Sequence, residues 1–274
     1  MNRRTVLSLV ALISITMAVL GCGISCRTST AVSKTPTVDK IQQRGTVLVG
    51  TTGDYRPLSY REPETGEYWG FCLDVAGEIA KSLNVSVTYV PTSWPTLSAD
   101  VQDSTLFDFA IGGITITDAR KETMDMSEGY LGNGKTILCR KEDVSKYTCQ
   151  EDLKHPQVRV MVNPGGLNEK FARANLPNCT LIVFDKNEEI PNQVAEGHAD
   201  VMITEITEAP WYVQNDSRLA APLLDKPFTR GRIGVLMRKG QDDLMDVVNT
   251  TIRQMKDNGR LKALHEKYGL QYAF

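Results

Sequence analysis

Four polar side chains stand where a folded chain can present groups to a ligand. Arg120 follows a Gly-Gly-Ile-Thr segment, and its planar guanidinium can hold a carboxylate through two parallel hydrogen bonds. Glu169 follows a glycine-rich turn, and a positioned carboxylic acid can protonate a leaving group. Asn168 can orient Glu169 or a ligand hydroxyl, and Lys135 can counter a carboxylate. These residues indicate an anion site with an acid, although a solvated cation or a helix-capping glutamate is their ordinary role.

The backbone of the glycine-rich turn is a second candidate for anion binding. Residues 165–168, which include Gly166 and Leu167, precede a helix that we expect to begin near Asn168. Unpaired N–H groups and the helix dipole at such a start favour a negative charge. Thr115 stands just past an expected strand, and we expect it to line the same site.

Aromatic and acidic side chains complete the candidate set. Tyr55 and Trp94 stand near expected strand ends and can offer flat faces to a ring, although aromatic residues there are as often core. We expect Glu205 to point into a ligand-binding cleft and to pair with an ammonium group of the ligand. Neither Cys-x-x-Cys nor His-Glu-x-x-His occurs, and the three histidines lie far apart in the sequence, at His155, His198 and His265. We therefore expect neither a metal site nor a cofactor.

These side chains must be positioned by elements that the apolar pattern indicates. From Thr46 onward, β-branched runs alternate with segments of helical period, which is typical of an α/β fold with mainly parallel strands. The expected strands cover residues 46–50, 85–90, 107–111, 158–162, 181–184, 200–204 and 233–237. One helix is expected over residues 71–83, where apolar residues recur every four positions. A stripe of Leu244, Val248, Ile252 and Met255 predicts a second, which Asn258-Gly259 ends before a shorter helix over residues 261–268.

Small or polar residues follow several of these expected strands. They read Gly-Thr-Thr-Gly-Asp-Tyr after the first, Gly-Gly-Ile-Thr-Ile-Thr after the third, Asn-Pro-Gly-Gly after the fourth and Thr-Glu after the sixth. Loops whose backbone approaches a ligand closely need such residues. Because ligands of open α/β sheets bind beyond the carboxyl ends of the strands, we expect the cleft there.

The N-terminus has the pattern of an export signal. Two arginines precede an uncharged apolar run over residues 5–20, which is short for a membrane span. Val19-Leu20-Gly21-Cys22 resembles a lipobox, in which the cysteine is lipidated after cleavage. We expect residues 1–21 to be a lipoprotein signal peptide, with a plain signal peptide or an uncleaved anchor as alternatives, and residues 22–40 to be a tether. The protein would then be periplasmic or at the cell surface, anchored in a membrane through Cys22.

Composition narrows the class of protein. The 274 residues allow one large domain or two smaller ones beyond the signal. A net charge of -2 and a pI near 6.0 give no basic footprint, so nucleic acid is not expected as a partner. Lipidation of Cys22 would leave five cysteines, an odd number that forbids complete pairing. Cys139 and Cys149 bracket a short loop and can form a disulfide, whereas Cys72 is expected to be buried as a small apolar residue.

Three segments resemble the polar amino-acid class of bacterial solute-binding proteins. They are the run from Gly50 to Tyr60, Gly70-Phe71 with Asp74, and the run from Gly113 to Thr117 with Arg120. The resemblance implies an α/β, two-lobed periplasmic-binding-protein-like fold of type II, with the ligand cleft between lobes joined by two hinge strands. It implies lobe 1 over residues 41–136 plus 229–274 and lobe 2 over residues 137–228.

A narrower resemblance is to the cyclohexadienyl dehydratases, exported enzymes built on that fold. Its motifs are Thr92-Ser93-Trp94-Pro95, Gly134-Lys135-Thr136 and the run over residues 163–176, which begins Asn-Pro-Gly-Gly-Leu-Asn-Glu. It implies the decarboxylative dehydration of prephenate to phenylpyruvate and of arogenate to phenylalanine, a step of phenylalanine biosynthesis. Leu167 stands where that family usually has Thr, so a contact from a side-chain hydroxyl is lost there. Glu205 stands where the family usually has Asp, which changes the fit around the substrate's amino or keto group.

On the dehydratase interpretation, Glu169 is the general acid that protonates the departing hydroxide. We expect cleft closure and the substrate's negative charges to raise its pKa more than the helix start lowers it. The competing hypothesis is a non-catalytic receptor that delivers an amino acid or a similar anion to an ABC transporter permease. A lipid anchor fits that receptor, while Glu169 within the long motif favours the enzyme. Either function takes a small carboxylate ligand.

Overall fold

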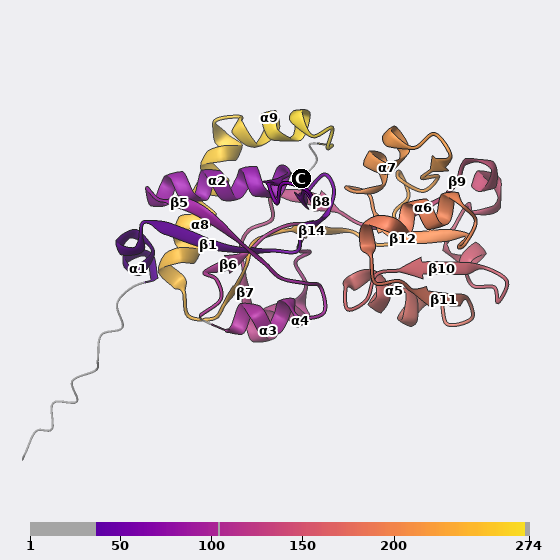
Figure 1. Ribbon diagram of the computed structural model, residues 1–274, viewed down its shortest axis with the longest axis horizontal. Helices are drawn as coiled ribbons and strands as arrows, with labels where there is room; N and C mark the ends of the chain where they lie inside the picture. The colour runs from indigo at the N-terminus through magenta and orange to yellow at the C-terminus, as the bar shows by residue number, and fades with distance from the viewer. Residues whose placement is uncertain (1–36, 104, 272–274) are drawn as a thin grey trace, which may run out of the picture. The chain divides into compact units, whose positions relative to one another are not determined.

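Two five-stranded mixed sheets form the framework of the protein. The computed structural model describes residues 37–103 and 105–271. The strand order is β5-β1-β6-β15-β7 in the first sheet and β11-β10-β12-β9-β13 in the second (Figure 1). We call the part of the chain built on the first sheet lobe 1 and the part built on the second sheet lobe 2.

The first sheet has parallel pairs on one side and antiparallel pairs on the other. Strand β1 (Thr46–Thr51), the second in the order, pairs in parallel with the edge strand β5 (Ser86–Pro91) and with the middle strand β6 (Phe109–Ala110). Strand β15 (Leu236–Arg238) returns from the C-terminal part of the chain and runs antiparallel to β6 and β7 (Met124–Met126). A small antiparallel sheet of β2 (Asp54–Tyr55), β3 (Ser59–Arg61) and β4 (Tyr68–Trp69) follows β1.

Helices pack on both faces of the first sheet. The larger apolar core contains the buried stripes of four of them, namely α1 (Thr37–Arg44), α2 (Phe71–Leu83), α8 (Asp242–Asp257) and α9 (Arg260–Lys267). On the other face, α3 (Leu97–Gln102) packs against β15, and the short α4 (Asp118–Thr123) lies on the same side in Figure 1. The helix α2 forms because its apolar residues share one face, and Asn84 ends it in a left-handed conformation.

The second sheet is built in the same way. Strand β10 (Arg159–Val162) pairs in parallel with β11 (Thr180–Val183) and β12 (Val201–Glu205). Strand β9 (Lys135–Arg140) is antiparallel to β12 and to β13 (Leu219–Ala220). Because successive side chains of a strand point to opposite faces, β9, β10 and β12 each contribute to two separate apolar cores.

Short helices cover the two faces of the second sheet. One core holds the buried side of α5 (Leu167–Asn175), and the other holds α6 (Ile190–Ala195) and α7 (Ala209–Asn215). Both α6 and α7 have proline in the first turn, where its missing N–H costs no hydrogen bond. Three short 3-10 helices complete the described part of the lobe, η1 (Lys141–Lys146), η2 (Gln150–Leu153) and η3 (Asn187–Glu189).

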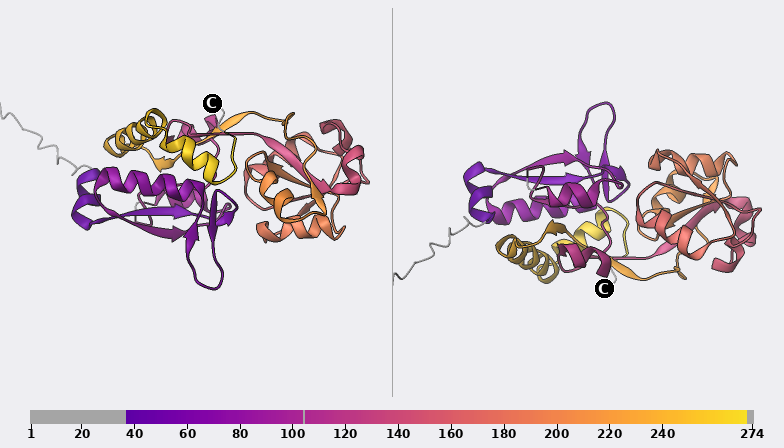
Figure 2. Two further views of the ribbon diagram at one scale, coloured as in Figure 1. Left: turned by 90° about the horizontal axis from the view of Figure 1, so that it is seen from above. Right: turned by 90° about the horizontal axis from the view of Figure 1, so that it is seen from below.

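Two antiparallel strands carry the chain between the lobes. Strand β8 (Leu131–Asn133) leads from β7 to β9, and β14 (Gly231–Ile233) leads from β13 back to β15 (Figure 2). Gly134 lies beside this crossing, and a Cβ atom there would come 2.2 Å from the carbonyl oxygen of Thr229. Glycine is therefore required where the two connecting segments approach each other. We propose that these strands are the hinge expected between the lobes.

Most expected elements are confirmed, two expectations are wrong and one strand was missed. The run over residues 233–237 is two strands, because the chain leaves β14 after Ile233 and enters the other sheet at Leu236. Strand β9 was not expected. Residues 37–40, expected at the end of the tether, are helical because Ile41 anchors α1 in the core of lobe 1.

The described cysteines are all free thiols, so the disulfide considered between Cys139 and Cys149 does not form. Cys139 is buried inside lobe 2 as part of β9, whereas Cys149 is exposed. Cys72 is buried as expected, and burial raises its pKa to about 12. The expected signal peptide, Cys22 and the tether up to residue 36 lie outside the described residues. Within the part that is described, every helix is too short or too polar to cross a membrane.

Candidate functional site

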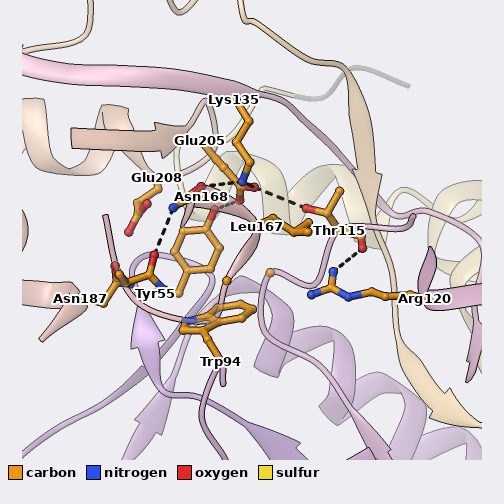
Figure 3. A pocket seen from close by; sticks show the side chains of 13 residues that line it. Tyr55, Trp94, Thr115, Arg120, Lys135, Leu167, Asn168, Asn187, Glu205 and Glu208 are labelled. Carbon is orange, nitrogen blue, oxygen red and sulfur yellow. Dashed lines mark hydrogen bonds and ion pairs between the residues drawn. The ribbon is translucent and has the colours of Figure 1, made fainter. Parts of the chain in front are cut away.

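A pocket lined by both lobes collects most of the expected ligand-binding residues (Figure 3). The space between its atoms, including the part open to solvent, is about 350 Å³. Nine of the ten expected residues line it, namely Tyr55, Trp94, Thr115, Arg120, Lys135, Gly166, Leu167, Asn168 and Glu205. Glu169 does not line it. Four lining residues were not expected, namely Gly113, Asn163, Asn187 and Glu208.

Lys135 and Glu205 form a buried pair at one wall of the pocket. They stand opposite each other in the ladder of β9 and β12, which brings their side chains together. The Lys135 Nζ lies 2.5 Å from Glu205 Oε1 and donates to Asn168 Oδ1 at 2.6 Å. Tyr55 donates its hydroxyl hydrogen to the other oxygen of Glu205. Burial lowers the pKa of Lys135 and raises the pKa of Glu205, because each charged form loses its hydration.

This pair changes what Glu205 can do for a ligand. Glu205 was expected to pair with an ammonium group, but its two oxygens are already engaged by Lys135 and Tyr55, and Thr115 Oγ1 lies 3.5 Å from one of them. Asn168 likewise contacts Lys135 and, at 3.5 Å, Asn163, and within the described residues its side chain makes no hydrogen bond to Glu169. Lys135, Glu205 and Asn168 therefore form a polar wall in which Lys135 is bonded to both of the other side chains.

Arg120 offers a positive charge on another side of the pocket (Figure 3). Its Nη1 donates to the carbonyl oxygen of Thr115 at 2.5 Å, and Thr117 caps the start of its helix α4. Burial lowers the pKa of Arg120 to about 10, so the guanidinium is still charged at neutral pH. Among the described residues it forms no ion pair. A half-buried guanidinium without a carboxylate partner is suited to bind one from a ligand.

Two aromatic rings form the apolar part of the wall. Tyr55 and Trp94 meet edge to face, with ring centroids 5.9 Å apart and planes at 78°. The indole Nε1 of Trp94 donates to both carboxylate oxygens of Asp54, at 3.0 and 3.1 Å, which fixes the ring. Gly113 permits the contact, because a Cβ at this position would lie 2.3 Å from the Tyr55 ring. The arrangement leaves ring surface in the pocket for a flat or apolar ligand.

Glu208 is a buried carboxyl group on the opposite side of the pocket from Arg120 in Figure 3. It follows the turn after β12, stands at the N-cap position of α7 without a side-chain capping bond and is 1% exposed. Thr204 Oγ1 donates to its Oε2 at 2.5 Å, and the Tyr212 hydroxyl donates to its Oε1 at 3.3 Å. Burial raises the pKa of Glu208 to about 8, against the effect of these two hydrogen bonds. Glu208 therefore carries a proton at neutral pH.

Glu169 has the opposite environment: in the structure its pKa is lowered, whereas we expected cleft closure and the substrate's charges to raise it. Its side chain accepts the backbone N–H of Gly165 at 2.7 Å and pairs with Arg173 one helical turn later, also at 2.7 Å. These bonds hold its pKa below the ordinary value. The N–H of Gly165, expected to bind an anion, is thereby used within the turn. Glu169 closes the first turn of α5 and is absent from the pocket wall.

The position in the sequence gives only a weak indication that the unexpected residues line the pocket. Glu208 stands three residues after Glu205, so both follow the same strand end. Asn163 opens the Asn-Pro-Gly-Gly turn after β10, and Asn187 follows β11 in a polar run.

In the described part of the chain, His, Cys, Asp and Glu side chains form no group of three or more that is arranged to hold a metal ion.

Residues 47–271 match the family described as bacterial extracellular solute-binding proteins, family 3. The chain is 40% identical over 191 residues to a cyclohexadienyl dehydratase of Pseudomonas aeruginosa, with 70% of each chain covered. It is 31% identical over 231 residues to an L-cystine-binding protein of Escherichia coli, which covers 84% of this chain and 85% of that one.

Solved structures resemble the protein over most of its length. One is an ancestral amino-acid-binding protein described as a precursor of cyclohexadienyl dehydratase, with 36% identity, a TM-score of 0.78 and coverage of 85% of this chain and 99% of that one. Another is an ancestral cyclohexadienyl dehydratase, with 49% identity, a TM-score of 0.53 and coverage of 85% and 96%. The two-lobed fold and both expected resemblances are confirmed. The chain belongs to the bacterial extracellular solute-binding proteins of family 3.

Proposed function

We propose that the protein is a cyclohexadienyl dehydratase, which converts prephenate to phenylpyruvate and arogenate to phenylalanine. The observation that carries the proposal is Glu208, a buried carboxyl group that lines the pocket and keeps its proton at neutral pH. The 40% identity to the dehydratase of Pseudomonas aeruginosa supports it. Glu208 replaces Glu169 as the proposed general acid, because Glu169 is held in the charged form outside the pocket wall.

The reaction needs a proton donor and an anion clamp. In prephenate, the bond between the ring and its carboxylate breaks and releases carbon dioxide, and its electron pair becomes part of the aromatic ring. The bond to the hydroxyl on the opposite ring carbon breaks at the same time. Glu208 gives its proton to that oxygen, which leaves as water. Glu208 is left as a carboxylate and recovers its proton from solvent before the next turnover.

The other lining residues have roles in binding on this proposal. Arg120 holds a substrate carboxylate, and Tyr55 with Trp94 contacts the ring. Lys135 is held by Glu205 and Asn168 and counters a second carboxylate. Gly166 and Leu167 border the same space. Binding through fixed groups orients both reacting bonds with respect to Glu208.

The alternative is a receptor for an amino acid, as the L-cystine-binding relative is named. A receptor of that kind needs an acidic group free to meet the ligand's ammonium. Here Glu205 is engaged by Lys135 and Tyr55, and Glu208 is protonated at neutral pH. These two observations favour the enzyme.

The direct test is to incubate the purified protein with prephenate and to measure both phenylpyruvate and carbon dioxide. We expect the two products to appear in equal amounts, at a rate proportional to protein concentration. The same preparation is titrated with a panel of amino acids by calorimetry. Tight binding of an amino acid with no conversion of prephenate or arogenate would establish the receptor and reject the enzyme.

We also infer that a lipid on Cys22 anchors the exported protein in a membrane, as Val19-Leu20-Gly21-Cys22 suggests. Cys22→Ser should move the protein from the membrane fraction to the soluble fraction without changing its activity. Cys26→Ser, four residues later, is the matched control and should leave the protein in membranes. A Cys22→Ser protein that still sediments with membranes would contradict lipidation at Cys22.

A further inference from the structure

Asn187 joins the two lobes beside the pocket. It is the first residue of η3 in lobe 2 and is 6% exposed. Its Nδ2 donates to the backbone carbonyl oxygen of Asp54 in lobe 1, at 2.9 Å. Because a carbonyl oxygen only accepts hydrogen bonds, this contact fixes which end of the amide faces Asp54. The amide oxygen Oδ1 must therefore point elsewhere.

That oxygen is buried and has no hydrogen-bond partner among the described residues. A buried carbonyl oxygen without a partner loses its hydration and gains nothing in return. Nearby donors are engaged, since Tyr55 donates to Glu205, Trp94 to Asp54 and Lys135 to Glu205 and Asn168. Because Asn187 lines the pocket, a ligand that occupies it can supply the missing donor.

The donor must be a hydroxyl or an ammonium group of the ligand. Carboxylates and ketones cannot donate a hydrogen bond. Figure 3 shows Asn187 and Glu208 on one side of the pocket and Arg120 on the other. A ligand whose carboxylate pairs with Arg120 therefore places its far end toward Asn187 and Glu208. In prephenate, the group opposite the ring carboxylate is the hydroxyl that leaves.

We propose that Asn187 is a positioning and specificity residue that accepts a hydrogen bond from the substrate's departing hydroxyl, an assignment that rests on the proposed dehydratase function. The bond fixes the hydroxyl hydrogen on Asn187 Oδ1 and leaves a lone pair of the same oxygen to receive the proton of Glu208. It also discriminates against ligands of similar charge that lack the hydroxyl, because they leave Oδ1 unpaired. Phenylpyruvate, the product, is such a ligand, so the same residue favours product release.

The test compares two ligands in a variant whose turnover is expected to be greatly reduced. In the Glu208→Gln background, calorimetry measures the dissociation constants of prephenate and of phenylpyruvate, with and without Asn187→Leu. Loss of one hydrogen bond should reduce the preference for prephenate over phenylpyruvate by about tenfold. Glu188→Gln is the matched control, because it removes a neighbouring contact between the lobes, the 3.7 Å pair with Arg56, without touching the pocket. It should change both affinities by the same factor.

Each outcome decides the proposal. If Asn187→Leu weakens both ligands equally, as Glu188→Gln does, Asn187 only joins the lobes and the assignment is wrong. If Asn187→Leu does not fold, Asn187→Ala replaces it, since the smaller side chain introduces no clash. A protein that binds neither ligand before any change at Asn187 overturns the dehydratase function itself and with it this assignment. A selective loss for prephenate supports both.

Discussion

Two carboxyl groups of this protein show how environment sets the role of a residue. Glu169 and Glu208 both stand at the start of a helix, where the dipole favours the charged form. Glu169 is bonded by Gly165 and Arg173, and its pKa is lowered. Glu208 is enclosed between Thr204 and Tyr212, and burial raises its pKa to about 8. Burial therefore outweighs the helix start at Glu208, which, unlike Glu169, retains a proton for the proposed catalysis.

The first prediction separates these two groups by mutation. Glu208→Gln should lower the turnover of prephenate by about 10² to 10⁴, the usual scale of general acid catalysis, because the amide has no proton to give. Glu169→Gln should change turnover by less than about tenfold, since it affects only the turn before α5. Initial rates of phenylpyruvate formation at saturating prephenate measure both. The opposite order of effects would return Glu169 to the role of acid.

The second prediction concerns pH. A general acid works only while it is protonated, so activity should be full below the pKa of Glu208 and should fall as pH rises through about 8. The profile of kcat/KM reports the free protein, whereas the charges of bound substrate should move the fall in kcat to higher pH. Rates measured between about pH 6 and about pH 10 give both curves. The residual activity of Glu208→Gln should not show this fall at high pH. If the variant still shows it, the titration belongs to another group.

At the same scale, the sequence predicts most of the pocket but not its acid. Motifs place Arg120, Lys135 and Trp94 correctly in the wall, because they follow strand ends that face one cleft. They do not reveal that Glu169 turns back to Gly165, since this depends on a single side-chain rotamer. They also miss Glu208, whose distinguishing property is its burial at the start of α7, because the local sequence does not show that a glutamate is buried.

Among the elements, those with strong periodicity are the ones that sequence predicts well. The helix α2 has the expected bounds because four apolar residues fix its buried face, and α8 buries its whole expected stripe. Strand β9 has only a short apolar run, over residues 137–139, and lies antiparallel in the middle of a sheet. Its place is decided by pairing with β12, a contact between residues far apart in the chain. Local pattern cannot predict such a pairing.

The third prediction concerns Asp200 in lobe 2, which lies just before β12, beside the end of β9 and the start of β10. Asp200 accepts hydrogen bonds from Arg140 and from the side chain and backbone of Arg159. Burial alone would raise its pKa, but these bonds lower it to about 2. Because the pKa is lower folded than unfolded, the stabilisation is present above the ordinary pKa and is lost as pH falls through about 4 toward about 2.

Asp200→Asn should therefore lower the free energy of unfolding by up to about 2 kcal/mol at neutral pH, and the difference from the unchanged protein should shrink toward pH 2. Urea unfolding at about pH 7 and about pH 3 measures it. The exposed Asp246→Asn is the control and should have little effect at either pH. If Asp200→Asn lowers the free energy of unfolding by the same amount at both pH values, the ionised carboxylate is not the cause of the loss.

For the whole molecule, function depends on contacts that form only when the lobes meet. Tyr55 of lobe 1 donates to Glu205 of lobe 2, and Asn187 donates back to Asp54. The rings of Trp69 and Trp211 also meet across the lobes, with centroids 5.6 Å apart. The family resemblance predicts two lobes, but these pairs depend on how the lobes approach. The closed pocket is thus a property of the assembled chain, and no single segment contains it.

The last prediction tests how closely the two lobes approach each other, by adding a single methyl group between them. Gly165 of lobe 2 lies so close to lobe 1 that a Cβ would come 2.6 Å from the Cα of Pro95. Gly165→Ala should therefore keep the lobes apart and weaken prephenate binding by at least about tenfold. The substitution is also strained, since the φ of Gly165 is +73°, and Gly240→Ala provides a control with nearly the same strain, at φ +78° and with no atom near the added Cβ.

Both variants should lower Tm by a few degrees, because each places alanine in a left-handed conformation at a cost of about 1 to 2 kcal/mol. Only Gly165→Ala should also raise the dissociation constant for prephenate and prevent the decrease in radius of gyration that small-angle scattering detects when ligand closes the lobes. Equal binding by the two variants would mean that lobe 1 yields at Pro95, and that the bound state tolerates a wider cleft than the structure shows.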